Sequence, residues 1–195
     1  MRTALAAWLL AAGLGCTHVV TGLASLPYAE GAPPPSLEGS IDRTRVSIPG
    51  MELDVDLWNR HYTSAHEAAA LNRPRRGRYL LRLALAPAGE GFTLDPLEAV
   101  LQVDGERERP VLAEVRDSSA AGRPWPYVTR YTAQASTLAR GSRTTVILHF
   151  LGPVPLPDQD IRLDLGRALP GPGGAKGPVI RFRTMLWKAS HVWSD

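Results

Sequence analysis

The sequence feature that most constrains the fold is an alternation of apolar and polar residues with a period of two. In the stretch MELDVDL (residues 51–57), an apolar residue stands at every odd position and an acidic residue at every even position. Successive side chains of a β-strand point to opposite faces of the sheet, so this pattern predicts a strand with one buried face and one face in water.

The preceding stretch RTRVSI (residues 43–48) alternates in the same way, and Pro49-Gly50 follows it as a turn signal. A hairpin around this turn would place Arg45 opposite Asp54. Arginines then face acids on one side of the sheet while apolar side chains share the other side, as cross-strand energetics favour. The sequence therefore predicts an antiparallel pair with a defined register.

Seven further segments carry strand patterns, and turn signals such as Asp104-Gly105 separate them. They are residues 79–86, 97–103, 111–115, 128–135, 144–151, 159–165 and 179–187. Segment 144–151 (TTVILHFL) is apolar on both faces, which predicts a central strand. The 18 glycines and 17 prolines of the 195-residue chain also favour many turns over long helices.

We therefore expect an all-β fold, an antiparallel immunoglobulin-like β-sandwich of about eight or nine short strands spanning residues 41–195. The chain has one cysteine, so it lacks the disulfide of antibody domains and the similarity is one of architecture. One short helix is also predicted, because Ser64 and Glu67 have the spacing of a capping box and the helical pattern ends near Asn72.

Residues 16–40 precede this domain and contain Pro27 and the run Pro33-Pro34-Pro35, together with three glycines. This composition predicts a Pro/Gly-rich tether with polyproline character, not a folded element. A tether of this kind would hold a domain clear of a crowded membrane surface.

The first 15 residues have the pattern of a secretory signal peptide. Arg2 is the only charge before a run from Ala4 to Gly15 made of Ala, Leu, Trp and Gly. A basic start, a short apolar run and small residues at its end are typical of a signal that is removed from the mature chain. The run is too short to span a bilayer, which needs about 20 residues.

The end of this segment, Gly13-Leu14-Gly15-Cys16, resembles the lipobox of bacterial lipoproteins. The resemblance implies cleavage before Cys16, a diacylglyceryl group on its sulfur and a fatty acyl chain such as palmitate on its amine. It also implies a place in the bacterial cell envelope. Thr17 follows the cysteine in place of the Asp that marks inner-membrane retention in many such bacteria, so the resemblance favours the outer membrane, facing the periplasm.

Two other interpretations of Cys16 remain open from the sequence: a free thiol behind an ordinary secretory signal, or a residue within an uncleaved anchor. A lone free thiol is unusual in an oxidising compartment, where cysteines are normally paired. Two or more acyl chains, in contrast, hold a protein stably on a bilayer. Lipidation of Cys16 is therefore the expectation.

Charge and motifs argue against several function classes. The formal net charge of +3 is too small to indicate nucleic-acid binding. His66-Glu67 lacks the second histidine of a zinc-protease HExxH motif, and no Gly-x-Ser-x-Gly elbow is present. The Gly/Pro-rich loop LPGPGGAKGP lacks the spacing of a phosphate-binding loop. We therefore expect neither a metal nor a cofactor nor a catalytic residue.

The alternate acids Glu52, Asp54 and Asp56 admit a further interpretation as a calcium edge or a carboxylate pair. Alternate residues on one strand face lie about 6.6–6.8 Å apart, within the range of the acid pairs of glycosidases. Outward acids that face arginines explain the same pattern without chemistry, and this is the interpretation we favour.

Two groups of residues are candidates for binding. Arginines cluster in NRPRRGR, and guanidinium groups grip phosphates and carboxylates with two parallel hydrogen bonds; this group is Arg73, Arg75, Arg76 and Arg78. Aromatic residues near RPWPYVTRY and at the C-terminus form a candidate flat platform for a sugar ring or a partner chain; this group is Trp125, Tyr127, Tyr131 and Trp193. A solvated linker and the packing of one end of the sandwich are the ordinary alternatives.

The sequence as a whole predicts a non-catalytic, lipid-anchored envelope protein that presents a β-sandwich surface to another envelope component. An envelope protein is the expected partner, besides the membrane that holds the lipid. The alternative is a module that binds glycans or lipopolysaccharide through the same arginines and aromatic residues, and a hydrolase is the third hypothesis. Nucleic acid is not an expected partner.

Overall fold

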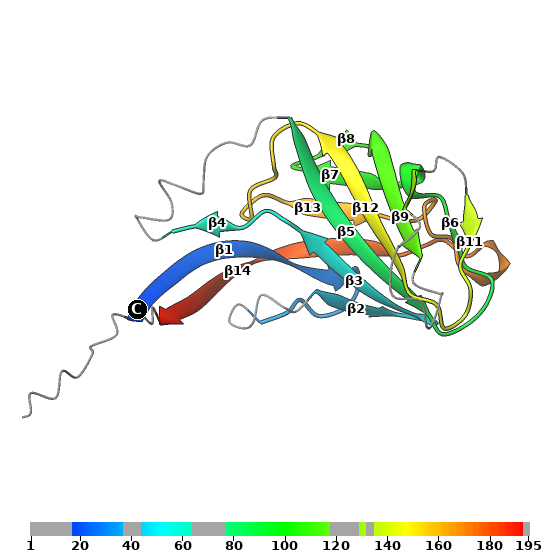
Figure 1. Cartoon of the computed structure of the whole chain (residues 1–195), viewed down its shortest axis with the longest axis horizontal. Helices are drawn as coiled ribbons and strands as arrows, with labels where there is room; N and C mark the ends of the chain where they lie inside the picture. The colour runs from blue at the N-terminus through cyan, green and yellow to red at the C-terminus, as the bar shows by residue number, and fades with distance from the viewer. Residues whose placement is uncertain (1–16, 37–43, 64–76, 118–128, 132–134, 193–195) are drawn as a thin grey trace, which may run out of the picture.

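The computed structural model describes residues 17–36, 44–63, 77–117, 129–131 and 135–192. The fold is an antiparallel β-sandwich, which confirms the predicted all-β architecture (Figure 1). Each of the nine segments that the sequence predicted as strands contains a strand.

The strands of the sandwich form two sheets of six, which we name sheet I and sheet II. Sheet I has the order β4 (His61–Tyr62), β1 (Thr17–Ala29), β14 (Val179–Val192), β13 (Ile161–Asp164), β7 (Val100–Val103) and β8 (Glu106–Glu108). Sheet II has the order β10 (Thr129–Tyr131), β9 (Leu112–Asp117), β12 (Thr144–Leu151), β5 (Arg78–Pro87), β3 (Met51–Leu57) and β2 (Arg45–Ile48).

Short elements complete the described chain. β6 (Thr93–Leu94) and β11 (Ser136–Thr137) form a separate two-stranded sheet, and two 3-10 turns are η1 (Pro96–Glu98) and η2 (Pro172–Gly174). Within the described ranges, no helix is long and apolar enough to cross a membrane. The predicted helix at residues 64–72 lies outside the described residues.

The predicted hairpin is present in the predicted register. β2 and β3 pair with Arg45 opposite Asp54 and Val46 opposite Leu53. Gly50 occupies the turn with a φ of 76°, a left-handed conformation that glycine adopts without steric cost. β12 is an interior strand between β9 and β5, as its apolar sequence predicted.

The main core lies between the two sheets. It is formed by side chains with almost no exposed surface that alternate along the strands of both sheets, including Leu53, Leu83, Leu148 and Phe150 from sheet II and Leu101, Leu163 and Ile180 from sheet I. The outer face of sheet II carries charged residues such as Asp54, Arg82 and Glu114. Period-two alternation thus produces the sandwich directly.

The interpretation of residues 16–40 as a tether is wrong for its first part. Residues 17–29 form strand β1, which pairs with β14 at thirteen positions, from Thr17 opposite Val192 to Ala29 opposite Ile180. The long-range hydrogen bonds to β14 outweigh the local effects of Gly22 and Pro27. Residues 33–36 are irregular, as the proline run predicted.

The β1–β14 pair is longer than the sandwich and projects from it (Figure 1). β13 pairs with β14 only as far as Arg181, and we name the ten residue pairs beyond Phe182 the arm, residues 17–26 and 183–192. The arm has its own buried cluster, listed here in full: Val20, Ala24, Leu26, Met185 and Trp187.

The buried face of β14 changes along its length. Phe182 packs in the main core, whereas Leu186, four residues on and on the same side of the strand, is 46% exposed. In the arm the neighbours Met185 and Trp187 are buried in its place. The apolar phase therefore shifts by one residue where the strand leaves the cover of sheet II.

Candidate functional site

Exposed apolar side chains gather at the end of the sandwich from which the arm projects. β3 ends here at Leu57, β12 ends at Leu151, and β5 and β9 begin here. The large hydrophobic residues with the most exposed surface in the described chain are Trp58, Val111, Leu151, Leu156 and Leu186. The first three lie along this end of sheet II, Leu156 lies in the loop after β12, and Leu186 lies on the arm.

A hydrogen bond links the loop after β12 to the arm. The Thr184 hydroxyl donates to the carbonyl oxygen of Pro157 at 2.5 Å. Asn59, just after β3, donates from its buried side-chain amide to the Ser25 hydroxyl of the arm at 2.7 Å. These hydrogen bonds connect the arm to the exposed end of the sandwich. We name this region the arm-end surface and define it by its exposed apolar and cationic residues, which are Trp58, Arg60, Arg78, Val111, Leu151, Leu156, Leu186 and Lys188.

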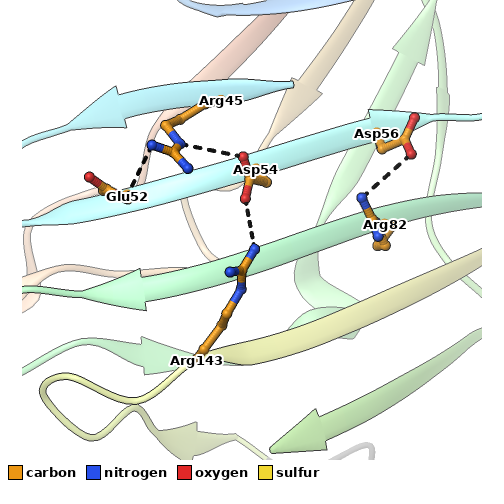
Figure 2. Close-up of polar contacts among 6 residues, drawn as sticks. All are labelled: Arg45, Glu52, Asp54, Asp56, Arg82 and Arg143. Atoms are coloured by element: carbon orange, nitrogen blue, oxygen red, sulfur yellow. Dashed lines mark hydrogen bonds and ion pairs between the residues drawn. The ribbon is translucent and has the colours of Figure 1, made fainter. Parts of the chain in front are cut away.

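Trp58 is an exposed aromatic residue, with 54% of its surface open to solvent. It follows β3 directly and has the outward phase of Asp56. Its indole Nε1 donates to Asp56 Oδ2 at 2.7 Å, and the same oxygen lies 3.7 Å from Arg82 Nη2, the pair drawn in Figure 2. The ring is thus held at its nitrogen while much of its surface stays open.

A small hollow of about 130 Å³ lies beside this ring. Its lining residues are Trp58, Arg78, Tyr79, Leu80 and Val154. Arg78 opens β5 and pairs in register with the exposed Leu151 of β12. The hollow therefore combines an aromatic ring, a guanidinium group and aliphatic walls, which suit a ligand with both an apolar part and an anionic group.

Tyr79 supports the hollow from the core side. Its hydroxyl donates to Glu108 Oε2 at 2.7 Å, and its ring stacks on Phe150 with centroids 5.2 Å apart. Burial, and then the hydrogen bond to Glu108, raise the pKa of this phenol well above its usual range. Tyr79 therefore stays a protonated hydrogen-bond donor at any physiological pH and does not serve as a base.

Cationic side chains at the arm-end surface lack acidic partners. Arg60, Arg78 and Lys188 are all exposed, and none of them forms an ion pair within the described ranges. Two acids lie nearby: the exposed Asp158 near Leu156, and Glu108, which accepts the hydrogen bond of Tyr79 beside the hollow. The three cations therefore outnumber these two acids by one, beside the apolar side chains of the surface.

The alternating acids on β3 behave differently, because arginines face them (Figure 2). Asp54 lies between Arg45 at 3.8 Å and Arg143 at 3.1 Å, and Arg45 also approaches Glu52 at 3.9 Å. These contacts support the interpretation as outward acids paired with arginines. In the part of the chain that the structure describes, no group of three or more His, Cys, Asp or Glu residues is arranged to hold a metal ion.

A histidine–carboxylate pair lies elsewhere on the outer face of sheet II. His149 Nε2 lies 3.0 Å from Glu114 Oε1, and Arg116 Nη2 lies 3.1 Å from the other oxygen of the same carboxylate. With both oxygens of Glu114 engaged, this group is a surface network, and no nucleophile of the described chain is hydrogen-bonded to the histidine.

Of the arginines predicted as a binding group, the structure describes only Arg78, at the hollow; Arg73, Arg75 and Arg76 lie outside the described residues. Of the aromatic residues, Trp125, Tyr127 and Trp193 lie outside as well, while Tyr131 ends β10 in register with Glu114. Cys16 also lies outside, directly before Thr17, the first residue of β1.

Trp58 was not among the residues that the sequence predicted for binding. The signal was present, since an aromatic residue follows MELDVDL at a position whose phase points outward, where the three preceding members are acids. A large apolar group in the solvent phase of an otherwise regular strand pattern indicates either local cover or a binding surface.

No protein-family model, no curated protein and no solved structure matches this chain.

Proposed function

We propose that the chain is a non-catalytic, lipid-anchored protein of the bacterial cell envelope that binds another envelope component through the arm-end surface. The proposed anchor is the lipid on Cys16, and the proposed location is the periplasmic face of the outer membrane. The observation that carries the proposal is the gathering, at one end of the sandwich, of exposed apolar side chains with cations that form no ion pair in the part of the chain that the structure describes. Exposed apolar patches rimmed by polar groups are typical of interaction sites.

The anchor is tested by the variant Cys16→Ala. If the lipid holds the protein, the wild-type chain pellets with membranes and the variant does not, because a chain without acyl groups has only weak surface contacts. The mass of the purified protein provides an independent reading, since a diacylglyceryl group and an amide-linked acyl chain add a defined mass at Cys16. A variant that pellets as the wild type does would contradict the anchor.

The binding surface is tested by brief crosslinking in cells, purification in mild detergent and identification of whatever co-purifies by mass. We expect a stoichiometric component whose recovery falls when Arg78 is changed to Glu. Arg140→Glu is the matched control, because Arg140 is exposed, forms no ion pair within the described ranges and lies at the opposite end of the sandwich. Equal recovery with both variants would contradict the proposed surface.

The hollow beside Trp58 favours a second candidate function, the binding of glycans or lipopolysaccharide. An exposed indole beside Arg78, which has no acidic partner among the described residues, suits a sugar ring that carries a phosphate or carboxylate. If this function holds, envelope sugars change the tryptophan fluorescence of the wild-type protein and leave that of Trp58→Ala unchanged. The same change in both proteins would exclude this hollow as the sugar site.

A further inference from the structure

The position of β1 places strict limits on where a lipid on Cys16 can lie relative to the sandwich. Cys16 is joined directly to Thr17, which pairs with Val192 at the tip of the arm. One residue spans at most about 3.6 Å, so no flexible linker separates the lipid from the arm. The ten residue pairs of the arm measure about 30 Å, which bounds the distance from the anchor to the sandwich.

The arm itself has the charge of a membrane-facing element. Its two strands, residues 17–26 and 183–192, contain Arg183 and Lys188 and no acidic residue. The exposed Leu186 lies on the same side of β14 as Lys188, two residues away. An apolar side chain beside a lysine is suited to the boundary between acyl chains and headgroups, where the lysine reaches the phosphates.

The end of the sandwich next to the arm has matching chemistry. Trp58, Leu151 and Leu156 are about half exposed, and neither Arg78 nor Arg60 forms an ion pair with another described residue. Tryptophan is enriched at membrane–water interfaces because its ring is apolar and its nitrogen is polar. Each lysine or arginine close to an anionic leaflet is worth about 1 kcal/mol.

We propose that the arm-end surface lies against the membrane that holds the lipid of Cys16, with Arg60, Arg78 and Lys188 on phosphate-bearing headgroups and Trp58 in the interface. The inference rests on the anchor of the proposed function and names the envelope component that this surface binds. A bilayer is favoured over a protein partner because the surface and the anchor share one end of the molecule. The lipid retains the protein, and the surface fixes its orientation.

The test uses the full, lipidated chain reconstituted into vesicles of phosphatidylcholine, alone or mixed with phosphatidylglycerol. An environment-sensitive fluorophore is attached at Leu151→Cys, which is the only free thiol because the lipid blocks Cys16. The matched control carries the same label at Glu90→Cys, an exposed position in the loop after β5, at the far end of the sandwich.

We expect a blue-shifted emission and quenching by headgroup-labelled lipids at position 151, greater in the anionic vesicles, and neither effect at position 90. The double change Arg78→Glu and Lys188→Glu should abolish most of the shift. The control pair Arg140→Glu and Lys176→Glu, at exposed cations of the opposite end, should leave it unchanged.

Three results would overturn the inference: equal emission at positions 151 and 90, a shift that ignores both charge reversals, or a shift that appears only when a co-purifying protein is added. The last result would assign the surface to a protein partner. The mass of the same preparation reports lipidation separately. A chain without lipid contradicts the anchor, whereas a lipidated chain without the shift contradicts only the membrane contact.

Discussion

At the scale of single residues, Tyr79 connects the core to the candidate hollow through a proton that it does not readily lose. Its pKa is raised by burial and by Glu108, so the unfolded chain loses this proton at lower pH than the native chain does. The contribution of the protonated phenol to stability is therefore complete below about pH 10 and is lost as pH rises above it.

We predict that Tyr79→Phe flattens the alkaline part of the stability curve. The variant should be less stable at neutral pH by roughly 0.5–1.5 kcal/mol, because Glu108 loses its hydrogen-bond donor. Melting temperatures between neutral pH and about pH 11 should fall less steeply for the variant than for the wild type. Parallel curves would show that Tyr79 ionises equally in the native and unfolded chains.

Gly22 is a second residue whose role depends on its surroundings. A Cβ atom at this position would lie 2.6 Å from the carbonyl oxygen of His61 and 2.7 Å from the Trp187 ring. Gly22→Ala should therefore cost about 1–3 kcal/mol of unfolding free energy in a denaturant titration, because the backbone of β4 must move. Gly89→Ala is the control, since nothing lies within 4 Å of its Cβ position. Equal effects of the two changes would contradict the close approach at Gly22.

Arg78, Gly22 and Trp58 show what the sequence predicts at the scale of single residues and what it does not. Arg78 was identified because arginines cluster around it, which is a local pattern. Gly22 was interpreted as part of a tether, because its partner Trp187 is 165 positions away and only the pairing of β1 with β14 brings them together. Trp58 carried a local signal in its outward phase, although the hollow beside it also requires Arg78 and Val154 from other strands and loops.

At the scale of elements, the β2–β3 hairpin shows how charge pairing accompanies apolar pairing. Asp54 contacts Arg45 of β2 and Arg143 in the turn before β12, yet both arginines are largely exposed. Asp54→Asn should lower the unfolding free energy by less than about 1 kcal/mol, and added salt should shrink the difference. Asp158→Asn, at an exposed acid without an ion pair in the described chain, should have no effect.

If Asp54→Asn instead abolished a hydrolytic turnover, the hydrolase hypothesis would hold.

The strands that the sequence predicted differ in a physical property from β1, the long strand that it missed. β3, β5 and β12 lie inside sheet II and turn one face to the main core along their length, so their burial follows a period of two. β1 and β14 leave the sandwich, and the buried face changes where they do so. β1 therefore has no uniform alternation in its own sequence, and its pairing with β14, of which the sequence predicted residues 179–187, determines its conformation.

At the scale of the whole molecule, the buried side chains fall into two clusters that share no member. The main core joins the two sheets, and the smaller cluster lies within the arm. Elements with few buried apolar contacts open at lower free energy than the core of a domain. The arm should therefore open as a unit of its own while the sandwich stays folded, although β1 and β14 run continuously through both.

Amide hydrogen exchange of Trp187→Ala tests this division. Trp187 is the largest member of the arm cluster, and its truncation should destabilise the arm by about 3 kcal/mol, roughly a hundredfold in exchange rate. Amides of Ala24 and Met185 should exchange faster by that factor, whereas those of Leu83 and Leu163 in the main core should keep their wild-type rates. Leu163→Ala is the converse control and should accelerate both sets, because global unfolding opens the arm as well. Equal acceleration of both sets in Trp187→Ala would mean that the arm and the sandwich form one cooperative unit, in which case a lipid at the tip of the arm would be coupled rigidly to the core.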